Sequence, residues 1–225
     1  MSDEPLDVVD EQIGRGEVEP DTARAFEEEA LRVAGVGKER GIPLRIIGAL
    51  AFHHHCPEFG YFQAKMNRVY TDIDFAAYAK QSRQIRQLFV SIGYDEDVEI
   101  NSFHAEAGRL IFNNPTSHIH VDVFMDRLDF CHPIPWKGRL EVDYPTIPLA
   151  ELVLEKMQIV KINEKDIIDT IMLFREHEIG KDDDDRINGT RVAALQARMD
   201  EYPKGTKWRL RAKVGDKKRW YKAID

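Results

Sequence analysis

Thr71-Asp72-Ile73-Asp74-Phe75 is the stretch of this sequence that most strongly indicates its fold. It opens an expected β-strand over 73–78, in which successive side chains point to opposite faces. Asp72 and Asp74 are therefore expected on one face, while the apolar residues between and after them face the core. Two carboxylates at this separation repel each other unless a cation neutralises them, and oxygen-only ligands suit Mg²⁺. The pair predicts a magnesium site.

A third acid, Asp122, stands in an alternating apolar stretch over 119–124 that predicts another strand. A charge in the middle of such a strand is costly unless it is paired or bound to a metal. If this strand neighbours the first, Asp122 converges with Asp72 and Asp74, and three carboxylates can hold two metal ions about 4 Å apart. We predict all three as metal ligands and catalytic residues.

The histidines offer another kind of metal site. His118 and His120 alternate with Asp122, so a two-histidine, one-carboxylate site for iron or zinc is the alternative. Three ligands from one strand rarely converge on one ion, which favours the carboxylate site and leaves His120 a role in tuning Asp122 or touching substrate.

A separate run, His53, His54 and His55, spreads over about 200° of an expected helix and cannot chelate one ion together. We expect these three histidines to be partly solvated, with one of them at most near a bound nucleotide.

The whole pattern predicts an α+β fold, with a mixed sheet flanked by helices, a helical C-terminal half and a small basic hairpin. Expected strands span 44–47, 73–78, 100–103, 109–112 and 119–124. Expected helices span 22–40, a segment from 49, then 81–92, 149–160, 164–177 and 188–202. Between the last two, 181–186 carries four consecutive aspartates, which we interpret as a solvated linker.

We divide the chain into four parts: an acidic flexible N-terminal segment (1–19), an α/β core (20–147), a helical region that completes the site (148–202) and a basic aromatic tail (203–225).

Two further motifs accompany the acids. Gly48-Ala49-Leu50-Ala51 follows a short strand and opens a helix, and Arg68 begins an Arg-x-x-x-Asp-x-Asp segment. This order, over about 44–177, resembles the nucleotidyltransferase superfamily that includes polymerase beta, and within it the AbiEii-type toxins. The resemblance implies an enzyme that uses two Mg²⁺ ions to move a nucleoside monophosphate from an NTP, such as ATP, to an acceptor hydroxyl. It implies nucleotide contacts from Gly48, Ala49, Arg68 and Thr71. The family usually has a second glycine or a serine where this chain has Ala49.

The helices after the sheet carry further residues that the resemblance assigns to the site. Lys156 is implied as a catalytic and nucleotide-binding residue, and Asp166, with Asp169 beside it, as an acid that completes the site. A lysine next to a nucleotide neutralises phosphate charge, and a buried acid can hold that lysine or a helix in place. The alternative is an ordinary surface pattern of charges at i,i+4 spacing.

The acceptor and the partners stay open at this point. RNA such as tRNA, a protein side chain and a small molecule all offer hydroxyls, and the resemblance also implies a toxin with an antitoxin partner. Two other classes of function are compatible with the sequence. One is a nucleotide- or RNA-binding module of the same fold without turnover. The other is a partner-binding component whose acidic N-terminal segment docks an antitoxin or another basic protein.

Charge is unevenly distributed along the chain. The net charge is −8, although 204–225 holds nine Lys or Arg against two Asp, so the rest of the chain carries about −15. Basic and apolar residues alternate around Gly215-Asp216, which predicts a hairpin that either holds RNA phosphates and stacks bases or packs its aromatics on the body.

The two cysteines, Cys56 and Cys131, lack the spacing of a zinc site or a disulfide framework. No apolar stretch approaches the roughly 18 residues that span a bilayer, and the first residues lack a secretory pattern. We expect a cytoplasmic protein without membrane contact.

Overall fold

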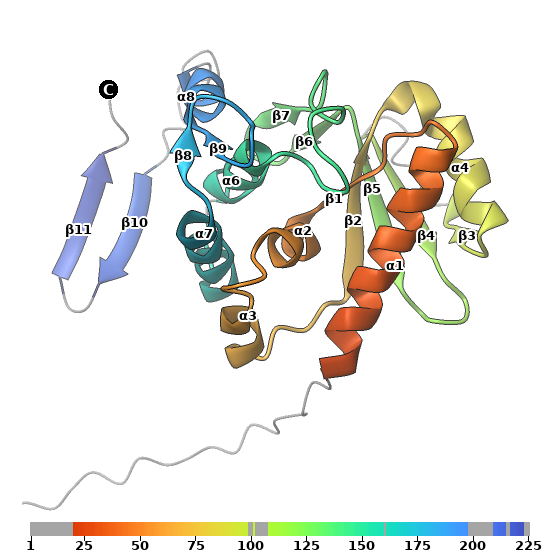
Figure 1. Cartoon of the computed structure of the whole chain (residues 1–225), viewed down its shortest axis with the longest axis horizontal. Helices are drawn as coiled ribbons and strands as arrows, with labels where there is room; N and C mark the ends of the chain where they lie inside the picture. Colours follow the sequence, from red (N-terminus) through yellow and green to blue (C-terminus); the bar gives the residue numbers. More distant parts are fainter. Residues whose placement is uncertain are drawn as a thin grey trace, which may run out of the picture.

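The computed structural model describes residues 20–98, 101, 108–159, 161–197, 209–214 and 217–222. At its centre lies a five-stranded sheet with the strand order β1-β2-β5-β4-β3 (Figure 1). The strands are β1 (Arg45–Ile47), β2 (Asp72–Ala77), β3 (Asp95–Glu96), β4 (Arg109–Asn113) and β5 (His120–Met125). β2 and β5 run parallel, and every other neighbouring pair in this sheet is antiparallel. The expected mixed sheet and the α+β fold class are confirmed.

Helices connect and flank these strands. They are α1 (Pro20–Glu39), α2 (Gly48–His55), α3 (Tyr61–Lys65), α4 (Ser82–Ser91) after a 3₁₀ turn (Ala79–Gln81), α6 (Leu149–Met157), α7 (Glu164–Glu176) and α8 (Gly189–Ala197). α1 packs on α4 and on β1 and β2, whereas α2 contacts β1 and β2 and also α6 and α7 (Figure 1). α2 therefore joins the sheet to the helical second half. Two short ladders, β6 (Arg127–Asp129) with β7 (Pro133–Pro135) and β8 (Ile179–Gly180) with β9 (Ile187–Asn188), complete the described body.

The core follows from the alternation in the two central strands. Ile73 and Phe75 of β2 and Val121 and Val123 of β5 are fully buried, as the period of two requires. Phe112 of β4 stacks on Phe89 of α4 with their ring centroids 4.2 Å apart. The polar positions between these apolar residues are left on the opposite face of the sheet, where the three acids lie.

The prediction of a strand over 100–103 is wrong at Asn101, the one residue of this range that the structure describes. Asn101 donates its backbone N–H to Asp97 O at 2.8 Å, which is a helical hydrogen bond. Its buried side chain accepts a hydrogen bond from Ile111 N at 2.7 Å and donates one to Ile111 O at 3.1 Å. An asparagine amide offers the same donor and acceptor as a peptide group. The side chain of Asn101 therefore makes with Ile111 of β4 the two hydrogen bonds that a neighbouring strand would have made.

The basic tail forms the expected hairpin, because β10 (Arg209–Val214) pairs antiparallel with β11 (Lys217–Lys222). Its turn at Gly215-Asp216 and the N-terminal segment 1–19 lie outside the described residues, as does the end of the helix expected over 188–202. Among the helices that are described, none combines the length and the apolar character needed to cross a membrane.

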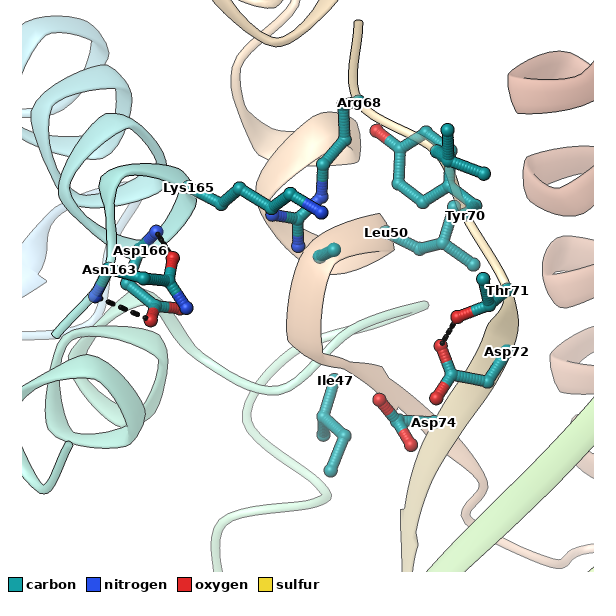
Figure 2. Close-up of a pocket in the computed structure, with 12 residues that line it drawn as sticks. Ile47, Leu50, Arg68, Tyr70, Thr71, Asp72, Asp74, Asn163, Lys165 and Asp166 are labelled. Carbon is teal, nitrogen blue, oxygen red and sulfur yellow. Dashed lines mark hydrogen bonds between the residues drawn. The ribbon is translucent and has the colours of Figure 1, made fainter. Parts of the chain in front are cut away.

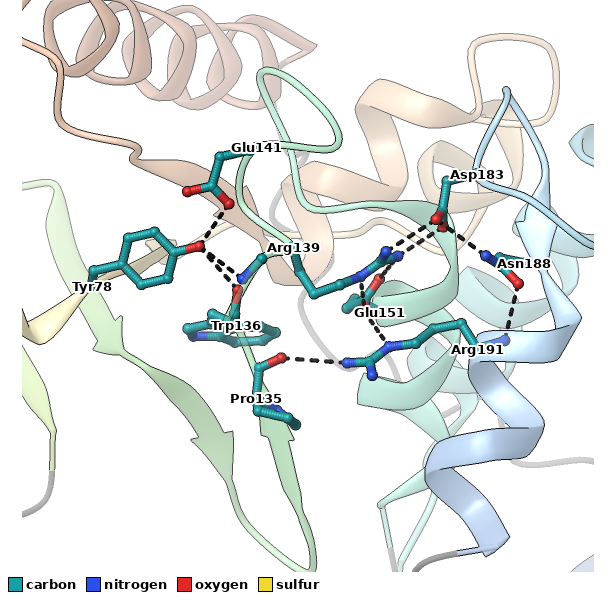
Figure 3. Close-up of polar contacts among 10 residues, drawn as sticks. Tyr78, Pro135, Trp136, Arg139, Glu141, Glu151, Asp183, Asn188 and Arg191 are labelled. Carbon is teal, nitrogen blue, oxygen red and sulfur yellow. Dashed lines mark hydrogen bonds and ion pairs between the residues drawn. The ribbon is translucent and has the colours of Figure 1, made fainter.

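A buried charge cluster joins the helical region to the aspartate run (Figure 3). Glu151 of α6 is completely buried, and its carboxylate accepts hydrogen bonds from Arg139 Nε at 2.7 Å and Arg191 Nε at 2.9 Å. Arg139 also pairs with Asp183 at 2.7 Å. The interpretation of 181–186 as a solvated linker is therefore wrong for Asp183, because that residue fixes the loop to the body.

We expect Glu151→Ala to lower the free energy of unfolding by about 3–5 kcal/mol, because it leaves two guanidinium groups without their shared buried carboxylate. Urea denaturation followed by circular dichroism measures this change. Asp184→Ala, at an exposed position one residue beyond Asp183, is the matched control and should change stability by less than about 0.5 kcal/mol. Equal effects of the two substitutions would show that the cluster does not stabilise the fold.

Candidate functional site

Three carboxylates converge where β2 and β5 lie side by side. In the parallel register Asp74 is the partner of Asp122, and Asp72 precedes Asp74 on the same face. One oxygen from each of Asp72, Asp74 and Asp122 lies within 4.8 Å of the others. The strand pairing on which the third acid depended is thus present, and three oxygens at this spacing fit a hard cation such as Mg²⁺.

The histidine alternative does not assemble. Within the described parts of the chain, the only group of three or more histidines, cysteines and acids spaced to hold a metal is the carboxylate trio. His118 is exposed. His120 places Nδ1 2.8 Å from Asn113 Oδ1 and Nε2 3.5 Å from Asp122 Oδ1. Of the two histidines, it is His120 that adjoins the trio.

Burial and mutual repulsion disfavour the charged form of the middle acid. Burial, and then the neighbouring charges of Asp72 and Asp122, raise the pKa of Asp74 to about 7, although Arg109 and Lys156 act in the opposite direction. A carboxylate in this position gains more than usual from a cation that neutralises it.

Arg109 is a site residue that the sequence did not reveal. From β4 its Nε and Nη2 donate to the two oxygens of Asp122 at 2.9 and 2.5 Å. The contact depends on the antiparallel pairing of β4 with β5. The turn signal Asn113-Asn114-Pro115 indicated a turn between these two strands, but nothing in the sequence marked Arg109 as the partner of Asp122. Arg109 balances one of the three negative charges and fixes the orientation of Asp122.

The glycine turn after β1 directly adjoins the acids. Gly48 has φ +65°, a conformation that favours glycine, and a Cβ atom there would lie 2.9 Å from Asp74 Oδ2. On its other side, Gly48 N donates to Glu155 Oε2 at 3.2 Å. Glycine is therefore required at position 48 both by the backbone and by the approach of Asp74.

Glu155 is a second residue beside the acids to which the sequence analysis assigned no role, although it assigned one to the neighbouring Lys156. It is buried in α6, and burial raises its pKa to about 8. Its Oε1 has no hydrogen-bond partner among the described residues, while Oε2 holds the glycine turn. Glu155 therefore connects the helical region to the turn next to the acids.

A pocket of about 250 Å³ opens beside the acids (Figure 2). The residues that line it are Ile47, Ala49, Leu50, Arg68, Val69, Tyr70, Thr71, Asp72, Asp74, Asn163, Lys165 and Asp166. The side chains of Arg68 and Lys165 point towards each other in the pocket, and Asp72 and Asp74 lie in another part of its lining. Thr71 Oγ1 donates to Asp72 Oδ1 at 3.0 Å. Ala49, Arg68 and Thr71 were expected here, whereas Lys165 was not.

Lys156 is buried, which excludes the surface charge pattern. Its Nζ lies 2.9 Å from Asp166 Oδ1 and 2.9 Å from Asp169 Oδ2. Burial alone would lower the pKa of Lys156, but the charges and hydrogen bonds of Asp169 and Asp166 outweigh it and raise that pKa. Asp166 also forms a reciprocal capping box with Asn163 at the start of α7. These acids therefore hold both the lysine and the helix.

Asp169 connects this lysine to the pocket. It is buried, accepts a hydrogen bond from Gln63 Nε2 at 2.7 Å and lies 3.7 Å from Arg68 Nη2. The ion pairs Arg68–Asp169 and Lys156–Asp169 place two cations on one carboxylate. The predicted residues of the second half therefore contact one another and meet the predicted Arg68.

The three consecutive histidines lie on α2, and none of them belongs to the group of possible metal ligands that the carboxylate trio forms. His53 and His54 are partly solvated, as expected, and both lie within 3.6 Å of Glu27. His55 is more buried, and its Nε2 lies 2.5 Å from Thr146 Oγ1. Burial, and then the neighbouring His54 and His177, lower the pKa of His55 to about 4.

Acidification should therefore destabilise the fold through His55. Its folded-state pKa lies below the ordinary value of 6.5, so the unfolded chain binds the extra proton first and stability falls as the pH drops from about 6.5 to 4. We expect a loss of about 2 kcal/mol from this group between pH 7 and 5. Urea denaturation of His55→Asn should show a smaller loss over that interval. Unchanged pH dependence in His55→Asn, with His54→Asn as the control, would contradict the assignment.

The described residues thus define an α+β protein with a three-carboxylate site beside a glycine turn and a pocket that Arg68 and Lys165 help to line. No protein-family model and no curated protein matches the sequence. Among solved structures, the solution structure of the antibiotic-resistance factor ANT(2'')-Ia is similar, with 12% identity and a TM-score of 0.45 over 81% of this chain and 100% of that one. A likeness at this level assigns neither an activity nor a substrate to the chain.

Proposed function

We propose that the protein is a Mg²⁺-dependent nucleotidyltransferase that moves a nucleoside monophosphate from an NTP to an acceptor hydroxyl. The observation that carries this proposal is the convergence of Asp72, Asp74 and Asp122 within 4.8 Å of one another, next to the turn at Gly48. Carboxylate oxygens beside a pocket that Arg68 and Lys165 help to line provide places for a divalent ion and for the phosphates that accompany it. The order of the motifs, which resembles that of the polymerase beta superfamily, points in the same direction.

Asp72 and Asp74 are proposed as metal ligands, and Asp122 as a third ligand or as the base that takes the acceptor's proton. Bound Mg²⁺, one ion or two, would neutralise charge on the triphosphate and on the leaving pyrophosphate. In the reaction, the acceptor oxygen forms a bond to the α-phosphorus, the bond between the α-phosphorus and the bridging oxygen breaks, and pyrophosphate leaves. The role of the protein is to place these groups in line and to balance their charge.

We assign the contacts with the nucleotide to residues of the pocket and of the helices next to it. Gly48 N is already used by Glu155, so we assign phosphate contact to the backbone amides that follow it, beginning with Ala49. Arg68 and Lys165 face the pocket and would contact phosphate oxygens, and Thr71 orients Asp72. Lys156, held by Asp166 and Asp169, is proposed as a further cation for the nucleotide.

The acceptor and the biological role are also part of the proposal. RNA such as tRNA, a protein side chain and a small molecule offer suitable hydroxyls. An AbiEii-like toxin that an antitoxin partner restrains would fit the motifs from which the resemblance was drawn.

A screen with labelled nucleotides tests the proposal. The protein is incubated with each of the four α-³²P-labelled NTPs, Mg²⁺ and either total RNA, a protein extract or small hydroxyl compounds. We expect one acceptor class to gain label, and Asp74→Ala or EDTA to abolish it. The labelled base and the labelled fraction identify the donor and the acceptor class together.

One observation favours a second candidate, a nucleotide- or RNA-binding module without turnover. Arg109 already occupies both oxygens of Asp122, which leaves that acid less free to bind a metal or accept a proton. Binding of NTP or RNA with no transfer in any of the screens would support the module and exclude the enzyme.

A further inference from the structure

A second hollow, of about 560 Å³, lies at the other end of the β1–β2 pair from the acids. β1 and β2 are antiparallel, and Arg45 at the start of β1 pairs with Ala76, whereas Ile47 at its end pairs with Asp74. The hollow is lined from the end of α1 and the turn that leads to β1, and from the segment that joins β2 to α4. None of its lining residues lines the pocket beside the acids, so the second hollow is a separate candidate site.

The charge of the second hollow is mainly positive. Lys38, Arg45 and Lys80 line it together with a single acid, Glu141. Within the described ranges, no carboxylate lies within ion-pair distance of any of these three cations. The acid is itself engaged, because the hydroxyl of Tyr78 donates to Glu141 Oε2 at 2.8 Å (Figure 3). Three cations against one acid leave an excess of two positive charges on a chain whose net charge is −8.

Arg45 is held in place by groups that do not neutralise it. The side chain is half-buried, its Nε donates to Asp143 O at 2.6 Å, and its Nη1 donates to Leu44 O at 3.0 Å. Two backbone carbonyls thus fix the plane of the guanidinium group and leave its charge uncompensated. Burial lowers the pKa of Arg45, which means that its charged form is disfavoured there, and an anion in the hollow would stabilise that form.

Tyrosine rings hold the cations at the walls of the hollow. Lys38 Nζ lies 4.1 Å from the centroid of the Tyr144 ring, and Arg45 Cζ lies 5.3 Å from the same centroid. Lys80 Nζ lies 5.1 Å from the centroid of Tyr78. The face of an aromatic ring attracts a cation without removing its charge. The rings therefore orient the three cations and leave their charges available to a ligand.

We propose that the second hollow binds a phosphate chain, that is, two or more linked phosphate groups, between Arg45, Lys38 and Lys80. Such a ligand carries the two or more negative charges that the hollow lacks, and phosphate oxygens accept hydrogen bonds from both guanidinium and ammonium groups. The amide of Gln84 lines the same hollow and offers further N–H donors.

A free nucleotide and an RNA strand both supply this chemistry. The volume of the hollow lies in the range of about 300–1,000 Å³ that small-molecule sites occupy. An RNA strand would place only part of its backbone there. Binding in the second hollow does not depend on the reaction proposed above, because that reaction uses the pocket at the other end of the strands.

Footprinting of lysines in the full-length chain tests the proposal. The protein is acetylated briefly without Mg²⁺, with or without tripolyphosphate, and mass spectrometry gives the rate at each lysine. Acetylation of Lys38 and Lys80 should slow by about tenfold when the tripolyphosphate concentration is about ten times its Kd. Lys65 is the matched control, since its Nζ lies 5.0 Å from the centroid of Tyr61 outside the hollow, and its rate should not change. Lys165 reports separately on the pocket beside the acids.

Two variants show whether the cations act together. Arg45→Gln should abolish the protection of Lys38 and Lys80 by tripolyphosphate, and urea denaturation reports whether this variant is folded. Lys80→Gln removes a charge at an exposed position and should reduce the protection of Lys38, whereas Lys65→Gln should leave that protection unchanged.

A parallel footprint with a single-stranded RNA oligonucleotide separates the two sources of phosphate. Protection at lower concentrations of tripolyphosphate than of RNA would indicate a free nucleotide, and the reverse order would indicate an RNA strand. Three results would overturn the proposal: no protection of Lys38 and Lys80 by either ligand, protection that survives both Arg45→Gln and Lys80→Gln in folded protein, or equal protection by the dicarboxylate succinate.

Discussion

Asp74→Asn should abolish Mg²⁺-dependent transfer, by about 10³-fold or more, while leaving the fold as stable as the wild type or more stable. The amide keeps the shape of the carboxylate but cannot neutralise a cation, and metal ligation supplies several kcal/mol of transition-state stabilisation. Burial and the neighbouring acids raise the pKa of Asp74, so its charge is a cost to the folded protein that asparagine removes. Rates of label transfer and urea denaturation at pH 8 measure the two effects.

The combination of lost activity and retained stability is diagnostic of a functional acid. Asp129→Asn is the control, since that exposed acid of β6 pairs with Arg127 on the surface and should change neither quantity. A destabilised Asp74→Asn would instead mean that the acid serves the fold, and equal transfer rates in the two variants would remove Asp74 from the site.

Lys156→Met should damage both stability and activity. It leaves Asp166 and Asp169 facing each other without their shared cation, which we expect to cost about 3–5 kcal/mol in the free energy of unfolding. The loss of a cation near the nucleotide should also lower kcat/KM. Urea denaturation and transfer kinetics measure the two effects, with Lys161→Met at an exposed position as the control.

A second substitution separates the two roles of this lysine. In Lys156→Met/Asp169→Asn the uncompensated charge is smaller, so stability should recover in part while activity stays low. If activity recovers together with stability, Lys156 acts only by holding α6 and α7 together.

Local patterns predicted the parts of the site that depend on one strand or one turn. The period of two placed Asp72 and Asp74 on one face, and the glycine after a short apolar run marked the turn at Gly48. Asp122 could be predicted only conditionally, because its place depends on the pairing of β2 with β5, which lie far apart in the chain.

The residues whose roles the sequence did not reveal also depend on contacts between different elements of the fold. Arg109 reaches Asp122 from the neighbouring strand, and Glu155 reaches Gly48 from a helix about a hundred residues later in the chain. The sequence pattern predicted Asp183 as one of four solvated acids, but in the structure it forms an ion pair with Arg139 at 2.7 Å. The partners of Glu155 and Asp183 are distant in the chain, whereas Arg109 is close to Asp122 in the chain but meets it only in the register in which β4 pairs with β5. Neither periodicity nor spacing reveals such partners.

The position of the label in the donor nucleotide gives the most direct test of the central claim. The protein is incubated with the preferred NTP labelled with ³²P at either the α- or the γ-phosphate, together with Mg²⁺ and the acceptor fraction. Nucleotidyl transfer predicts that label from the α-phosphate becomes attached to the acceptor, that label from the γ-phosphate is released in pyrophosphate, and that Asp74→Asn yields neither. Transfer of the γ-label to the acceptor, or α-label transfer that Asp74→Asn leaves unchanged, would contradict it.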